Sequence, residues 1–422
     1  MRKYIFLLVV LFCAGSLVFS QTGNTRYVSV QKADLKSSTG FFSSVVGKLV
    51  MGDAVTLVRD DGRWSQVRSG NVTGWIQSTN LSTRRIVSSN VSSSGGAEVA
   101  LAGKGFSPAT ELEYKKEGLN FTMVDTMEQI TVPMDDLQRF ITNGRLNSGD
   151  ARATSTYNPF AAPASASSSA ADDEFTLVDS YYLGRSVAAN ILNSHKPFTQ
   201  NQEITQYVNR ICQTLVINSF GPPTYNGYFV MILDSNDAYA FASPGGHIFI
   251  SRGLVQATTS EDILAALIAH ELSHVMLKHG TSIISDMKFY NEMSEMANYA
   301  AGMAMGMAAA AGRNTTALQQ TLSFRDSITK IADTLMVSGY SQPQELEADR
   351  EAMSLLSKAG YDPRAMIDLL KILQRLPGGQ KGGLLSTHPS AAERIANTER
   401  AALSYSSSNT RQARVSRFNN RF

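Results

Sequence analysis

The feature that most constrains this fold is the stretch 260–280, SEDILAALIAHELSHVMLKHG, which has the pattern of a single buried helix. Ser260 is suited to the N-cap position, acidic residues follow it in the first turn, and Lys278 and Gly280 are suited to the opposite end. Apolar residues occupy most faces of the helix between these ends. The rest of the domain must therefore pack around this helix.

Two histidines within this helix, His270 and His274, are four residues apart and therefore lie one turn apart on the same face. That spacing lets both imidazoles reach one zinc ion at about 2.0–2.1 Å. Glu271 is placed to take a proton from a water molecule that the metal activates, which is the HExxH arrangement of zinc hydrolases. The alternative is a helix with two hydrogen-bonded core histidines. Three polar groups in an otherwise apolar helix need a partner, which favours one Zn²⁺ per chain.

The third protein ligand must come from elsewhere in the chain, because two histidines and a water leave one zinc position. A metzincin would need a histidine at position 280, which is Gly280, so His279 is expected only to pack or to form hydrogen bonds. A second helix is expected over 341–360, where Glu345 and Asp349 are four apart on one face. We expect Glu345 to bind zinc and Asp349 to accept from the outer N–H of a ligand histidine. The alternative is a solvated acidic helix face.

Residues 1–20 have the pattern of a secretory signal peptide, with a basic start, an apolar run and small residues before the expected cleavage site. We expect export to the periplasm or cell envelope. A retained membrane anchor and a peripheral membrane location are the alternatives. Lipidation at Cys13 is disfavoured because Phe12 precedes it.

The charges of the chain are nearly balanced, with 38 Lys and Arg against 36 Asp and Glu. Arg2 and Lys3 belong to the expected signal peptide, so the mature chain is neutral and carries no nucleic-acid footprint. Cleavage would also leave Cys212 as the only cysteine, which excludes a disulfide framework.

Residues 26–83 are expected to form a small all-β barrel, since short apolar runs alternate there with Gly and Asp turns. The segment 47–82, with Trp64 and Trp75, resembles a bacterial SH3-like domain. The resemblance implies binding to cell-wall peptide or to segments of envelope proteins. A spacer or a docking module within the same chain is the alternative.

The remaining divisions of the chain follow from composition and periodicity. Residues 84–147 are an intermediate region of unknown role, with a strand expected within 122–132 and helices at 111–116 and 134–141. A Ser/Ala-rich linker, a mainly helical domain and a disordered tail are expected at 148–173, 175–403 and 404–422. The helical domain should contain helices at 179–192 and 202–217 and strands at 228–233 and 247–250. The Met-rich stretch 285–312 is expected to be a lid beside the site, with a buried helix or a lipid contact as alternatives.

Four separated motifs together resemble one family: HELSH, the pattern from Glu345 to Asp349, the stretch 237–254, and Thr387-His388-Pro389 followed by Arg394. The family is that of the zinc endopeptidases related to HtpX, the mitochondrial protease Oma and the CAAX prenyl endopeptidases. The nearest branch is the soluble periplasmic one of BepA and LoiP. The resemblance covers roughly residues 175–400.

The resemblance implies an α+β fold, with a mainly helical zincin-like (gluzincin) domain and a small sheet placed after the SH3-like barrel. It implies Glu271 as general base and His388 near the metal, where it would stabilise the oxyanion. Arg394 would anchor the His388 loop by an ion pair. The metal ligands implied are His270, His274 and Glu345.

The expected function is hydrolysis of unfolded or misassembled cell-envelope proteins by the zinc-bound enzyme. We expect an extended substrate segment to add as a strand beside 247–250. The residues of this substrate strand would be Gly246, His247, Ile248, Phe249 and Ile250. Two alternatives remain open: a chaperone-like binding protein with a plugged zinc site, and a cell-wall-targeted peptidase.

Overall fold

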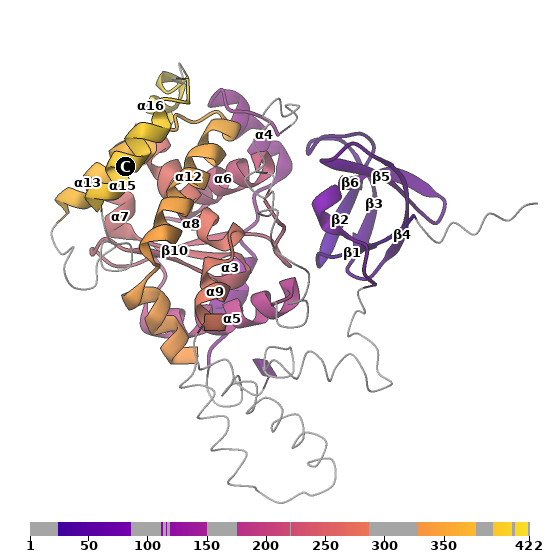
Figure 1. Ribbon diagram of the computed structural model, residues 1–422, viewed down its shortest axis with the longest axis horizontal. Helices are drawn as coiled ribbons and strands as arrows, with labels where there is room; N and C mark the ends of the chain where they lie inside the picture. Colours follow the sequence, from indigo (N-terminus) through magenta and orange to yellow (C-terminus); the bar gives the residue numbers. More distant parts are fainter. Residues whose placement is uncertain are drawn as a thin grey trace, which may run out of the picture.

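The computed structural model describes residues 24–85, 111–112, 115, 119–149, 175–219, 221–286, 328–376, 391–406 and 410–420. These residues form a small β domain beside a larger, mainly helical domain (Figure 1). The expected signal peptide, His388, and most of the expected linker and of the Met-rich stretch lie outside the described residues. No helix in the described parts of the chain has both the length and the hydropathy of a membrane span.

The β domain is a seven-stranded antiparallel sheet in the order β3-β2-β6-β5-β4-β1-β7. Its core consists of alternating apolar side chains, among them Val28, Leu35, Val67 and Ile76. The small all-β unit predicted from the sequence is confirmed. The strands are β1 (Thr25–Val28), β2 (Lys32–Lys36), β3 (Val45–Val50), β4 (Ala54–Asp60), β5 (Trp64–Ser69), β6 (Val72–Gln77) and β7 (Leu81–Ser82).

The helical domain contains a three-stranded sheet of β8 (Phe229–Leu233), β9 (Ala240–Ser243) and β10 (His247–Ser251). The strand order is β8-β10-β9, with β10 parallel to β8 and antiparallel to β9. The prediction that substrate adds beside 247–250 is therefore wrong, because both edges of β10 are already paired. Among the described residues, the edge on this side that pairs with no other strand belongs to β9, where the Tyr340 hydroxyl donates to the Ala242 carbonyl at 3.4 Å. The sequence did not reveal β9, since it has four residues and two are alanine, a weak strand former.

Helices cover both faces of this sheet. On one face, side chains such as Val230, Ile248 and Ile250 pack against two helices, α6 (Gln202–Asn218) and α8 (Glu261–Met276). On the other face, Phe241 and Phe249 pack against α5 (Leu177–Ser194) and against the helical residues 328–338, which end in the π-helical turn η3 (Thr334–Ser338). The principal helices are α5 (Leu177–Ser194), α6 (Gln202–Asn218), α7 (Arg252–Ala257), α8 (Glu261–Met276), α9 (His279–Asp286), α12 (Gln342–Ala359), α13 (Ala365–Arg375) and α15 (Ala391–Ala402).

Helix α8 is the central helix predicted from residues 260–280. The Ser260 hydroxyl accepts from the backbone N–H of Ile263 at 3.3 Å, as expected of an N-cap. The helix ends at Met276, earlier than predicted, because Lys278 has a left-handed φ of 58°. Gly280 does not end α8, because it lies in the first turn of α9.

The intermediate region contributes two helices to the larger domain, α3 (Thr122–Glu128) and α4 (Met134–Asn143). The strand predicted within 122–132 is therefore wrong over 122–128. Val124 and Met127 are three residues apart and both point from α3 into the core, which is a helical spacing. The residues that form this core are distant in the sequence. Their packing, rather than local propensity, determines that the short segment 122–128 is a helix.

The prediction of a disordered tail at 404–422 is wrong for residues 410–420, which contain helix α16 (Gln412–Asn419). Arg414 is 1% exposed and binds Asp262 through two hydrogen bonds of 2.9 and 2.6 Å. Arg417 binds Glu261 next to it. Helix α16 therefore neutralises the buried acidic first turn of α8.

Candidate metal centre

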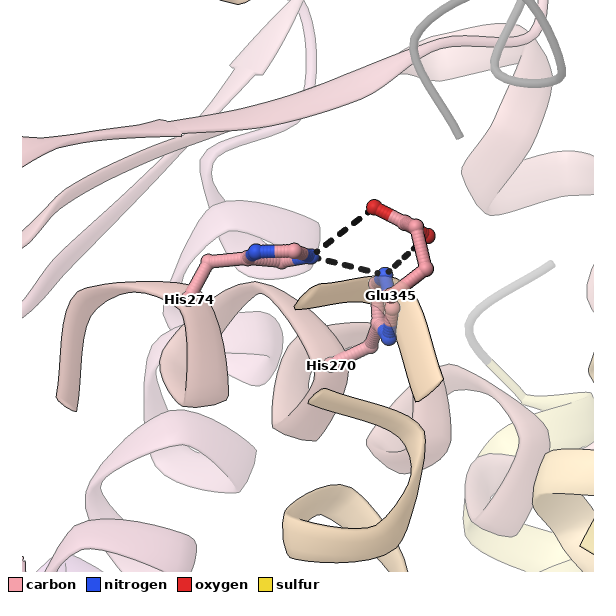
Figure 2. Close-up of side chains that lie close together, drawn as sticks. All are labelled: His270, His274 and Glu345. Atoms are coloured by element: carbon pink, nitrogen blue, oxygen red, sulfur yellow. Dashed lines mark hydrogen bonds and ion pairs between the residues drawn. The ribbon is translucent and has the colours of Figure 1, made fainter. Parts of the chain in front are cut away.

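Helix α8 presents His270 and His274 one turn apart, and α12 brings Glu345 to the same point (Figure 2). The two Nε2 atoms lie 3.1 Å apart. The Glu345 carboxylate lies 3.5 Å from Nε2 of His270 and 3.4 Å from Nε2 of His274. The three residues expected to bind the metal therefore converge.

This geometry fits a zinc ion. Two ligands about 2.0–2.1 Å from a tetrahedral zinc are about 3.3 Å apart. The three measured separations, 3.1, 3.4 and 3.5 Å, lie on either side of that value. All three side chains are at most 2% exposed, and a buried set of two imidazoles and a carboxylate is a zinc donor set.

The outer nitrogen of His270 is held by Asp349. Its Nδ1 lies 3.1 Å from the Asp349 carboxylate, which is the contact predicted from the sequence. Burial lowers the pKa of His270, but hydrogen bonds to Asp349 and Glu345 outweigh burial and raise it to about 9 in the metal-free protein. Asp349 therefore orients the imidazole with its other nitrogen toward Glu345.

Arg394 enters this group from α15. It binds Asp349 through two hydrogen bonds of 2.8 and 2.7 Å, and it lies 2.7 Å from the Glu345 carboxylate. Burial raises the pKa of Asp349, but Arg394 and His270 hold it below its ordinary range. Arg394 thus joins the start of α15 to α12. The preceding loop with His388, which Arg394 was expected to anchor, lies outside the described residues.

His274 has a different set of neighbours on its outer side. Its Nδ1 lies 2.9 Å from Nδ1 of His279, and Nε2 of His279 lies 3.4 Å from the Glu347 carboxylate. The Tyr340 ring stacks on the His274 imidazole, with centroids 3.8 Å apart and planes 14° apart. His279 thus forms hydrogen bonds, as expected. The contact with Tyr340 had no signal in the sequence.

Comparison with protein families now assigns the domain. Residues 200–402 match the model of Peptidase family M48, and residues 32–82 match that of the bacterial SH3 domain. The chain carries a peptidase family M48 domain. The resemblances to a zinc endopeptidase family and to a bacterial SH3 domain, both inferred from motifs, are confirmed.

Several curated proteins match this M48 domain. The Beta-barrel assembly-enhancing protease of Escherichia coli (strain K12) is 27% identical over 219 residues, which are 50% of this chain and 41% of that protein. Metalloprotease LoiP of the same strain is 29% identical over 195 residues, 46% of this chain and 69% of LoiP. Mitochondrial metalloendopeptidase OMA1 of Arabidopsis thaliana is 26% identical over 169 residues, 39% of this chain and 30% of that protein. The chain thus spans less than half of the first of these relatives.

Glu271 completes the M48 motif and is fully buried. Burial raises the pKa of Tyr340 well above its ordinary value, and the nearby charges of Glu271 and Glu345 raise it further. The metal-ligand candidates and Glu271 are all at most 2% exposed, so all four side chains are buried.

A pocket adjoins the centre on the His274 side. Its lining includes His274, Tyr340 and the turn from Ala242 to Gly245. Pro222–Thr224 and Tyr228, in the loop before β8, line the same pocket. The lining is mainly apolar, which suits an uncharged side chain.

A buried ionic network, which the sequence did not reveal, supports the M48 sheet from the intermediate region. Arg185 of α5 binds Glu111 at 2.7 and 2.8 Å and lies 2.9 Å from Glu128 of α3. Glu128 in turn lies 2.8 Å from Nε2 of His247, the first residue of β10. Burial raises the pKa of Glu128, but His247 and Arg185 lower it to about 2. The partners are too distant in the sequence for any local pattern to show this network.

Proposed function

We propose that this protein is a zinc-dependent endopeptidase that hydrolyses unfolded or misassembled proteins of the cell envelope. The observation that carries the proposal is the convergence of His270, His274 and Glu345 next to Glu271 in an M48 domain. The envelope location is supported by the name of one relative, the Beta-barrel assembly-enhancing protease.

Each residue has a chemical role in this proposal. Zinc bound at the site supplies a Lewis acid that polarises the substrate carbonyl and lowers the pKa of a water molecule. Glu271 accepts the proton of the attacking water and donates it to the leaving amine. Asp349 and His279 fix the outer nitrogens of the two histidines, so that both Nε2 lone pairs point to the same place. His388 remains the candidate for oxyanion stabilisation.

The substrate is proposed to bind as an extended strand along the free edge of β9. This strand contacts α8, and its small residues Ala240 and Ala242 lie in the core on the α8 side of the sheet. Pairing through backbone groups requires an unfolded segment and reads little of its sequence. Loosely folded or misassembled proteins are the substrates that offer such segments.

One observation favours a second candidate, a chaperone-like protein that binds substrates and rarely cleaves them. Glu271 and Glu345 are 0% exposed and His274 is 1% exposed, so the side chains of the centre are buried. If a substrate carbonyl rarely reaches Glu271, binding of unfolded chains would dominate over cleavage.

The test compares the zinc-loaded protein with its Glu271→Gln variant on an unfolded model protein. We expect both to bind one zinc and only the wild type to cleave. Zinc and substrate binding without cleavage by either protein would favour the chaperone-like candidate. Equal cleavage rates for stably folded and unfolded substrates would contradict the role in quality control. Retention of the full chain on purified cell wall would instead favour the cell-wall-targeted peptidase.

A further inference from the structure

The bacterial SH3 domain contacts the M48 domain through one group of residues, which we call the docking patch: Gln31, Phe41, Phe42 and Arg63. The backbone N–H of Gln31 donates to the carbonyl of Tyr225 at 2.8 Å. The Arg63 guanidinium donates to the carbonyl of Ile217 at the end of α6. Phe41 and Phe42 pack against the larger core of the M48 domain.

The docking patch is aromatic and tightly fitted. The Phe41 ring lies edge-on to Trp64 with centroids 5.2 Å apart, and Arg63 lies 5.3 Å from the centre of the Phe41 ring. Gly149 passes between the domains with a φ of 77°, and a Cβ there would lie 2.6 Å from the Ile217 carbonyl oxygen and 2.9 Å from Phe41. SH3 domains use aromatic-lined surfaces of this kind to hold peptide segments. Here the segment held belongs to the same chain.

The hydrogen bond from Gln31 reaches a compact loop, residues 221–228, which follows α6 in the chain. The Tyr228 hydroxyl donates to the carbonyl of Pro222 at 3.2 Å, and the Thr224 hydroxyl donates to that of Gly227 at 2.5 Å. A Cβ on Gly246 would lie 2.2 Å from the Gly227 carbonyl oxygen, so the loop lies directly against the turn between β9 and β10.

The same loop forms one wall of the pocket beside His274. The turn from Ala242 to Gly245, His274 and Tyr340 line the same pocket. Asn226 also donates to Glu128 at 3.0 Å, which ties the loop to the network under β10. Tyr225, which accepts from Gln31, therefore lies in the chain between the pocket-lining Thr224 and Asn226, which is bound to Glu128.

We propose that the SH3 domain is an intramolecular clamp that fixes the loop 221–228, and with it the pocket wall next to His274. Gln31 holds this loop of the same chain through Tyr225, while Arg63 and Phe41 hold the adjoining residues Ile217 and Gly149. An external peptide that binds to the surface formed by Phe41 and Trp64 would displace the docking patch and free the loop that lines the pocket. The clamp goes beyond the proposed function, because it requires no cleavage.

Hydrogen exchange of the full chain in a Glu271→Gln background tests the clamp independently of peptidase activity. We expect the Gln31 amide to be protected, because it donates to Tyr225 across the domains. The double substitution Phe41→Ala, Arg63→Ala should accelerate exchange in the peptide covering 221–228 by about tenfold or more. Arg59→Ala is the matched control, because Arg59 is exposed and stacks at 6.0 Å on Trp75 within the SH3 domain. It should leave this exchange unchanged.

A second variant guards against an SH3 domain that fails to fold. Gly149→Val changes neither the SH3 domain nor the loop, but places side-chain atoms where Phe41 and the Ile217 carbonyl lie. It should also accelerate exchange over 221–228. The clamp is refuted if, in the protein with an unchanged docking patch, the Gln31 amide exchanges as fast as an exposed loop amide. It is also refuted if Gly149→Val leaves exchange over 221–228 unchanged while small-angle scattering shows the domains separated.

Discussion

Arg394 is the residue whose replacement tests the account of the metal centre most directly. It is 1% exposed and lies between two carboxylates, those of Asp349 and Glu345, which are 2% and 0% exposed. Arg394→Met removes the cation and keeps much of the volume. In the metal-free variant, the carboxylates of Asp349 and Glu345 stay buried. Among the described residues, His270 is then the one cationic side chain that contacts both of them.

The expected loss of stability is large. Removing one partner of a buried ion pair costs about 3–5 kcal/mol, because the remaining charge stays buried without compensation. A domain of about 200 residues loses roughly 2–4 °C of Tm per kcal/mol, so Tm should fall by about 6–20 °C. The assay is thermal unfolding of the chelator-treated protein near neutral pH. Arg400→Met on the same helix is the control: Arg400 is exposed, and its loss should cost less than about 0.5 kcal/mol.

The pH dependence of this loss has a definite sign. The pKa of Asp349 is lowered in the folded wild type, so its stabilising contribution is present above the ordinary carboxyl pKa of about 3.9 and is lost as pH falls below it. Without Arg394 the pKa of Asp349 rises, and the carboxyl takes up a proton at a higher pH. The gap in Tm between wild type and variant should therefore shrink as pH falls from 7 toward 4. A gap below about 2 °C at neutral pH, well under the range expected for a buried pair, would show that Arg394 does not stabilise the two buried carboxylates.

Three further predictions concern the same domain. His279→Ala should weaken zinc binding by about 10–100-fold in a chelator competition, because His274 loses the partner of its outer nitrogen; unchanged affinity would exclude that role. Zinc uptake should release a proton, and its apparent Kd should rise about tenfold per pH unit below pH 9, because the pKa of His270 is about 9 without metal; a Kd independent of pH would contradict this. Gly184→Ala should sharply lower Tm or yield, since its Cβ would lie 1.7 Å from the Pro244 carbonyl oxygen.

The parts of the site that could be predicted from the sequence depend on local spacing. His270 and His274 are neighbours in any helix, and Glu345 and Asp349 share a face for the same reason. An apolar helix around three polar groups also implies burial, and α8 is buried along nearly all of its length. Local geometry therefore fixed four of the residues at the centre.

The parts that could not be predicted depend on contacts between distant residues. The substrate strand was assigned to β10 because its apolar residues give a clear strand signal, but whether a strand is central or at an edge depends on its partners. Tyr340 stacks on His274 through tertiary packing alone. Arg185 meets Glu111 and Glu128 from a different element of the chain. The spacing of residues along one helix or strand does not show contacts with distant parts of the chain.

The contact between α16 and α8 links the metal helix to the order in which the chain is made. Asp262 and its partner Arg414 are separated by 152 residues. At about 5–20 residues per second, Arg414 is synthesised about 8–30 s after Asp262. During that interval Glu261 and Asp262 have neither of their arginine partners, so burial of the first turn of α8 is unfavourable. A chain released before Arg414 is added would contain the whole HELSH motif. It would lack the arginine that neutralises Asp262 in the first turn of α8. Translation that stops early should thus yield fragments without a stable metal centre.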